Sequence, residues 1–145
     1  MLNSDYKEML QILSANDVRF LLVGAYAMGA YGHPRATGDI DIWVWATAEN
    51  SGKIYNSLKQ FGAPLAQINQ DSFTEEGIVF QIGVAPRRID ILSRIDGVDF
   101  EDAYEKRQIT DIDGIAVPLI SRQHLIKNKL ATGRKKDALD AEQLK

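Results

Sequence analysis

Apolar and polar positions at the start of the chain follow first the period of a helix and then that of a strand. Apolar side chains between Tyr6 and Leu13 recur every three or four residues, as on one helix face, and Ser4 is a candidate N-cap. The apolar run from Val18 to Val23 is typical of a buried strand and stops at Gly24. The sequence therefore predicts a helix followed by a strand.

A short helix, a second strand and a third helix are predicted next. Residues 25–31 form a helical segment that ends before Pro34, because proline disfavours helical geometry in the preceding residue. The chain returns to extended structure at Asp39–Trp45. Thr47 is placed to cap a further helix, which Gly62 closes.

The middle of the chain predicts two strands and two turns. The strands are expected at Ile78–Val84 and Arg88–Leu92, joined near Pro86. Asp-Gly pairs at 96–97 and 113–114 are turn signals that would organise later hairpins.

From Ser121 the pattern is helical again. This helix is predicted to end at Gly133, and a last helix is predicted to begin near Arg134. The side chains expected to face inward are Leu125, Ile126 and Leu130.

Length and composition fit one folded domain over residues 1–145, with 45% hydrophobic residues. Cysteine is absent, which excludes disulfides, Cys-ligated metal centres and thiol nucleophiles. The net charge of −3 argues against a protein that coats nucleic acid. The N-terminal residues do not form a signal peptide, and no apolar stretch reaches membrane-spanning length. We therefore expect a cytoplasmic protein without a membrane partner.

Two aspartates lie close together in the strand predicted at 39–45. Alternate side chains of a strand face opposite sides, so Asp39 and Asp41 point one way while the isoleucines between and after them enter the core. Paired anions repel unless a cation lies between them, and Mg²⁺ prefers oxygen ligands of this kind. Upstream, Gly24 lies where a strand gives way to a helix, a position whose free backbone N–H groups favour a phosphate.

The aspartate pair is not specific by itself. The Asp-Ile-Asp segment at 111–113 has the same spacing but runs into Gly114, so it is interpreted as a hairpin turn. Asp39 and Asp41 could likewise form the polar face of an exposed strand end that holds no metal. A later carboxylate, Asp90, is flanked by apolar residues on both sides, which a solvated loop aspartate would not need.

The order of an apolar strand, Gly24, a short helix and an Asp-x-Asp strand resembles the nucleotidyltransferase fold of the DNA polymerase β superfamily. The segment Arg35–Asp41 is similar to the Arg-x-Thr-x-Asp-x-Asp pattern of minimal bacterial and archaeal nucleotidyltransferase-like proteins, which include toxin–antitoxin and abortive-infection types. The segment Leu125–Asp140 extends the resemblance to the C-terminal helices. The resemblance implies an α/β (α+β) fold, with a mixed β-sheet flanked by helices.

The resemblance also implies roles for individual residues. Asp39, Asp41 and Asp90 would be the catalytic carboxylates and would hold two Mg²⁺ ions. The residues expected to bind the nucleotide are Gly24, Ala25, Arg35, Thr37, Lys129 and Arg134. Ala25 departs from the family pattern, which has Gly or Ser here, and its methyl group lies where the backbone would approach a phosphate.

Two functions are expected from these residues. The first is Mg²⁺-dependent transfer of a nucleoside monophosphate from a nucleoside triphosphate to a protein or RNA hydroxyl, in a toxin–antitoxin system. The second is a catalytically degenerate member that binds a nucleotide or a partner protein, which Ala25 favours. Because the chain is small, a partner protein or a second copy in a homodimer would complete the site. A phosphatase or nuclease is disfavoured, because no nucleophile or histidine accompanies the carboxylates.

Overall fold

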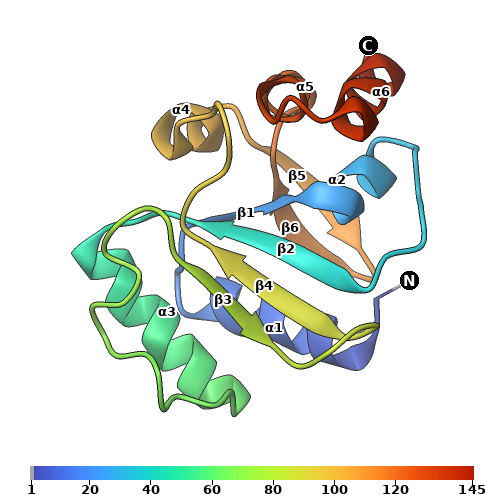
Figure 1. Ribbon diagram of the computed structural model, residues 1–145. Coiled ribbons are helices and arrows are strands. Elements are labelled where there is room, and N and C mark those ends of the chain that lie inside the picture. The colour runs from blue at the N-terminus through green and yellow to red at the C-terminus, as the bar shows by residue number, and fades with distance from the viewer. Residues whose placement is uncertain (1) are drawn as a thin grey trace.

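The computed structural model describes residues 2–145, which form one mixed sheet with helices on both of its faces (Figure 1). The strand order is β3-β4-β2-β1-β6-β5. In chain order the elements are α1 (Ser4–Ala15), β1 (Phe20–Val23), α2 (Gly24–Ala30), β2 (Asp39–Val44), α3 (Ala48–Phe61), β3 (Val79–Ile82), β4 (Arg88–Leu92), α4 (Phe100–Glu105), β5 (Gln108–Ile112), β6 (Ile115–Leu119), α5 (Arg122–Ala131) and α6 (Lys135–Leu144).

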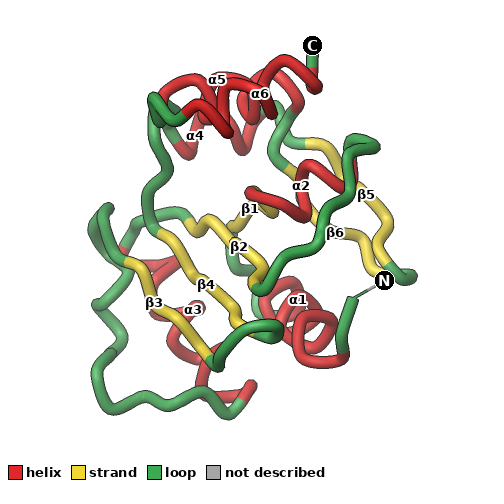
Figure 2. The backbone as a smooth tube through the Cα atoms, turned by 45° about the vertical axis from the view of Figure 1, so that its right-hand side comes forward, coloured by secondary structure: helices red, strands yellow, loops and turns green. Residues whose placement is uncertain are grey.

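The helices form two groups around the sheet. Figures 1 and 2 show α1 and α3 on one face, and α2 on the other face with α4, α5 and α6 beyond it. β1 pairs antiparallel with β2 and parallel with β6, while β2 pairs parallel with β4. No helix within residues 2–145 has both the length and the apolar character needed to cross a membrane.

Most helix and strand positions in the first half of the chain agree with the sequence prediction. Thr47 caps α3 by accepting a hydrogen bond from the backbone N–H of Asn50, and Gly62 ends this helix in a left-handed conformation with φ 92°. The cap predicted for α1 is wrong, because Asn3 rather than Ser4 accepts the hydrogen bond from Tyr6 N–H, at 2.9 Å.

The turn predictions in the second half have different outcomes. The Asp-Gly pair at 113–114 joins β5 and β6 in a hairpin, as predicted. The pair at 96–97 forms a tight turn closed by one bridge between Ile95 and Val98, and no hairpin of two full strands follows. The chain instead enters α4, a helix that the sequence pattern did not predict and that Asp99 caps.

The two C-terminal helices begin and end close to the predicted residues, with Ser121 as the N-cap of α5. Leu125 is fully buried, as predicted. The inward position predicted for Leu130 is wrong, since 52% of this residue is exposed. The neighbouring side chain of Lys129 instead turns towards α6, where it meets two carboxylates.

Asn50 ties the start of α3 to the edges of β1 and β2, and its removal would destabilise the fold. Its buried side chain accepts a hydrogen bond from Arg19 N–H and donates to the carbonyl oxygens of Arg19 and Trp45, at 2.8 to 3.0 Å. Asn50→Ala leaves these backbone groups unpaired, so we expect a loss of roughly 2–4 kcal/mol in the free energy of unfolding. Urea denaturation measures this loss.

The matched control is Asn69→Ala, which removes an exposed hydrogen bond to Asp71 N–H. We expect this variant to lose less than about 1 kcal/mol, because water replaces an exposed partner. Equal losses in the two variants would contradict the role assigned to Asn50.

Candidate functional site

The centre of the site is the place where β1 gives way to α2. Gly24 adopts φ +69°, a conformation that favours glycine, and a Cβ at this position would collide with the carboxylate of Asp41. Glycine therefore serves two needs here: it permits the turn, and it lets a carboxylate of β2 lie against the start of α2.

Three carboxylates converge on one face of the sheet. The parallel pairing of β2 and β4 sets Asp41 beside Asp90, and alternation along β2 puts Asp39 on the same face. Carboxylate oxygens of all three residues lie within 4.8 Å of one another. The structure thus brings together the three residues that the sequence analysis singled out as catalytic and metal-binding.

Arg88 is a further charged residue of this cluster, and the sequence analysis did not select it. Its Nη2 donates to Asp39 Oδ2 at 2.8 Å, and its Nε donates to Asp90 Oδ1 at 2.9 Å. The available signal was its position two residues before Asp90, which puts both side chains on one face of β4.

Asp41 lacks such a partner. Among residues 2–145, no Lys or Arg forms an ion pair with it, whereas Asp39 and Asp90 both pair with Arg88. Burial, together with the negative charges of Asp39 and Asp90, raises the pKa of Asp41 to about 7, and the positive charge of Arg88 offsets only part of this shift. A half-buried carboxylate without an ion-pair partner, beside two more oxygen ligands, fits a hard divalent cation such as Mg²⁺.

Thr37 lies at the entrance to β2 and orients Asp39. Its hydroxyl donates to Asp39 Oδ1 at 2.9 Å. The sequence analysis expected Thr37 to contact the nucleotide, and the residue does line the same cavity as Asp39. Its hydroxyl proton is nevertheless already used by the carboxylate.

The predicted phosphate-binding cations gather on the opposite wall. Arg35 donates to Asp140 Oδ1 at 2.7 Å, and Lys129 donates to Asp140 Oδ2 at 3.0 Å. Arg134 pairs with Asp137 at 2.8 Å. A loop residue and two residues of the C-terminal segment are thereby held together by two buried carboxylates of α6.

Asp137 and Asp140 are buried, yet they remain acidic. Burial opposes their ionisation, but a hydrogen bond from Thr132 and the nearby cations hold the pKa of Asp137 below its usual range. Hydrogen bonds from Arg35 and Lys129 outweigh burial in the same way for the pKa of Asp140. The two carboxylates therefore act as fixed anions that position the cations.

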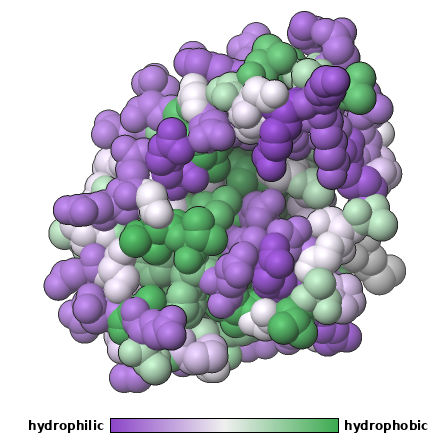
Figure 3. All heavy atoms as spheres, in the orientation of Figure 1, coloured by the Kyte–Doolittle hydropathy of each residue, from purple (hydrophilic) through white to green (hydrophobic). Residues whose placement is uncertain are grey.

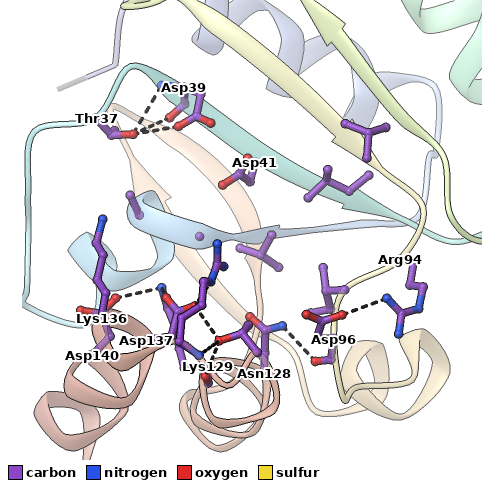
Figure 4. Close-up of a pocket in the computed structure, with 18 of the residues that line it drawn as sticks. Thr37, Asp39, Asp41, Arg94, Asp96, Asn128, Lys129, Lys136, Asp137 and Asp140 are labelled. Carbon is purple, nitrogen blue, oxygen red and sulfur yellow. Dashed lines mark hydrogen bonds and ion pairs between the residues drawn. The ribbon is translucent and has the colours of Figure 1, made fainter.

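A cavity of about 700 Å³ separates the carboxylates from the cations. Figure 4 shows Asp39 and Asp41 on the sheet side, and Lys129 and Lys136 on the helix side. Every residue predicted to bind nucleotide lines this cavity, namely Gly24, Ala25, Arg35, Thr37, Lys129 and Arg134.

Part of the cavity wall is apolar. Val79, Leu92 and Ile95 form an apolar part of its wall, beside Asp96 and Asn128. Figure 3 shows hydrophobic surface next to strongly hydrophilic surface on this hollowed face. The cavity wall thus combines charged and apolar side chains.

Comparison with solved structures identifies the fold. A Thermotoga maritima protein assigned as a nucleotidyltransferase matches 99% of this chain and 94% of its own, with a TM-score of 0.66 and 15% identity. The lincosamide antibiotic adenylyltransferase LnuA, bound to lincomycin, matches 99% of this chain and 96% of its own, with a TM-score of 0.58 and 15% identity. ANT(2″)-Ia in complex with adenylyl-2″-tobramycin matches 96% of this chain and 84% of its own, with a TM-score of 0.61 and 15% identity.

These likenesses establish that the chain has the nucleotidyltransferase fold, as the sequence analysis expected. No family model matches the chain, and no curated protein matches its sequence. The structures it resembles are nucleotidyl- and adenylyltransferases.

The raised pKa of Asp41, caused mainly by burial, predicts that stability depends on pH. The folded protein keeps a proton on Asp41 up to about pH 7, whereas the unfolded chain releases it near the ordinary value of 3.8. Stability therefore falls as the pH rises through this window. Asp41→Asn removes the charge, so we expect the metal-free variant to be roughly 1–3 kcal/mol more stable than wild type at pH 8, with a smaller difference at pH 5.

Thermal and urea unfolding in the presence of a chelator measure this difference. Asp111→Asn, on the exposed edge strand, is the control and should change stability by less than about 0.5 kcal/mol at both values of pH. A wild type that is as stable as Asp41→Asn at pH 8 would refute the raised pKa of Asp41.

Proposed function

We propose that this protein is a metal-dependent nucleotidyltransferase that moves a nucleoside monophosphate from a nucleoside triphosphate to a hydroxyl group. The observation that carries the proposal is the convergence of Asp39, Asp41 and Asp90 opposite a cationic wall, within a nucleotidyltransferase fold. Neither the carboxylates nor the cations alone would support it.

In this proposal the carboxylates of Asp39 and Asp41 hold divalent metal, with Mg²⁺ as the expected ion. Such an ion polarises phosphoryl oxygens and offsets the charge that develops on them. Asp41 lies against the first residue of α2, so metal and triphosphate would meet where the N–H groups of Gly24 and Ala25 are free to donate.

The opposite wall supports binding of the triphosphate. Arg35 and Lys129 reach the cavity from different elements, and Asp140 fixes the position of both. Lys136 lines the same wall and is exposed. Cations held in place before the ligand arrives stabilise charge on phosphate without reorganising during transfer. In this proposal, these cations offset the weaker contact between phosphate and the backbone at Ala25, which the methyl group of this residue causes.

The acceptor would lie beside the carboxylates with its hydroxyl directed at the α-phosphate. A protein or RNA hydroxyl is the acceptor implied by the family resemblance, and a toxin–antitoxin system, with a partner protein or homodimer completing the site, is the corresponding role. The complexes of similar enzymes with lincomycin and with an adenylylated tobramycin support a small hydroxyl-bearing molecule as the alternative acceptor.

A second candidate function is nucleotide or partner binding without catalysis. Two observations favour it: Ala25 stands at the phosphate-facing position, and Arg88 already neutralises part of the carboxylate cluster. Nucleotide binding that depends on metal is the property that separates the two candidates.

Isothermal titration of ATP, GTP, CTP and UTP, with and without Mg²⁺, tests the proposal without knowledge of the acceptor. We expect wild type to bind at least one triphosphate with Mg²⁺, and the double variant Asp39→Asn/Asp41→Asn to lose at least tenfold in affinity. The reason is that an amide replaces each charged oxygen ligand.

The chain supplies a matched control in its second Asp-Ile-Asp segment. Asp111→Asn/Asp113→Asn makes the same two changes in the β5–β6 hairpin and should bind as wild type does. Folded wild type that binds no triphosphate, or equal losses in both double variants, would count against the transferase and favour the binding-only alternative.

A further inference from the structure

Arg88 occupies the edge of the carboxylate cluster between Asp39 and Asp90. Its Nε donates to one oxygen of Asp90 at 2.9 Å and its Nη2 to the other at 3.1 Å, so both oxygens of this carboxylate are engaged. The same Nη2 donates to Asp39 Oδ2 at 2.8 Å. Paired hydrogen bonds between charged groups are strong and fix the orientation of both partners.

This arrangement separates Asp90 from the cavity. Asp90 is only 5% exposed and is absent from the cavity wall that includes Asp39 and Asp41. Asp41 faces the cavity, and within residues 2–145 it forms no ion pair. Arg88 thus bonds both Asp39 and Asp90, but only Asp39 and Asp41 line the cavity, so a ligand in the cavity reaches these two carboxylates and not Asp90.

The net charge of the cluster also favours one divalent cation. The three carboxylates in their ionised form carry three negative charges, and Arg88 supplies one positive charge, which leaves two negative charges. In the protein without nucleotide, one divalent cation balances this remainder, and a second would reverse its sign. A second metal ion would also need the oxygens of Asp90, to which Arg88 already donates. Arg88 and a second metal ion therefore compete for the same oxygen atoms.

We propose that Arg88 takes the place of one of the two metal ions expected from the family resemblance, so that the site binds a single divalent cation through Asp39 and Asp41. The inference rests on the proposed function, because it concerns the cation that nucleotide transfer needs. Arg88 is then a positioning residue, which fixes Asp90 and supplies permanent positive charge at the inner edge of the cluster. Thr37 fixes the remaining oxygen of Asp39.

Counting Mn²⁺ ions on the protein tests the inference. The complex of the full chain with α,β-methylene-ATP, an analogue that resists transfer at the α-phosphate, is titrated with Mn²⁺ by calorimetry and by electron paramagnetic resonance. We expect wild type to bind one Mn²⁺ with an uncoupled spectrum. We expect Arg88→Gln to bind two, with the spin coupling of ions about 3.5–4 Å apart.

Arg94→Gln is the matched control. Arg94 lines the cavity and pairs with Asp96 at 2.9 Å, so this variant removes one positive charge, as Arg88→Gln does, without touching the carboxylate cluster. It should bind one Mn²⁺, as wild type does. A second ion in both variants would show that general charge, and not the place held by Arg88, sets the count, and would overturn the inference.

Two spin-coupled ions on wild type would also overturn it, and this result does not depend on the folding of any variant. A single ion on folded Arg88→Gln would show that Arg88 does not exclude the second ion. Wild type that binds neither Mn²⁺ nor the analogue would refute the proposed function together with the inference, whereas two ions would refute the inference alone.

Discussion

Repulsion among Asp39, Asp41 and Asp90 is the constraint that the rest of the site must withstand. The parallel pairing of β2 and β4 holds these carboxylates together, so they cannot separate unless the sheet opens. Burial of the alternate residues of the same strands resists that opening, at roughly 1.5–3 kcal/mol for each side chain. These fully buried residues are Ile40, Ile42, Ile89 and Ile91. The alternation of side chains along β2 and β4 thus gathers the carboxylates on one face of the sheet and buries, on the other face, the isoleucines that hold the strands together.

The cations on the opposite wall of the cavity also repel one another. Arg35, Lys129 and Arg134 come from a loop, a helix and the turn between two helices, and their mutual repulsion would push these segments apart. Asp137 and Asp140 bind them from α6, which is how the last helix becomes part of the site. Water screens the pairs of Arg35 and Lys129 with Asp140 less than it screens a surface pair, because these side chains are largely buried.

The β1–α2–β2 segment and its aspartates could be predicted because each signal is local: an apolar run, a glycine at its end and a period of two. Arg88 could not be chosen on those grounds, because its role depends on Asp39, which lies on another strand and becomes a neighbour only through strand pairing. The helix α4 has six residues, too few for a clear helical period. Leu130 lies on the exposed side of α5, although its apolar side chain suggested an inward position.

The two walls differ in the charge that remains after their internal pairs are counted. With all three carboxylates ionised, Arg88 leaves the carboxylate cluster with two negative charges. The opposite wall carries four cations and two carboxylates, which leaves two positive charges; these residues are Arg35, Lys129, Arg134, Lys136, Asp137 and Asp140. A metal–polyphosphate complex supplies the missing partner to both walls at once, cation to the sheet and anion to the helices. Metal alone or phosphate alone would satisfy only one wall and leave the other unmatched. Each component must therefore strengthen the binding of the other by the same factor, since coupling between two ligands is reciprocal.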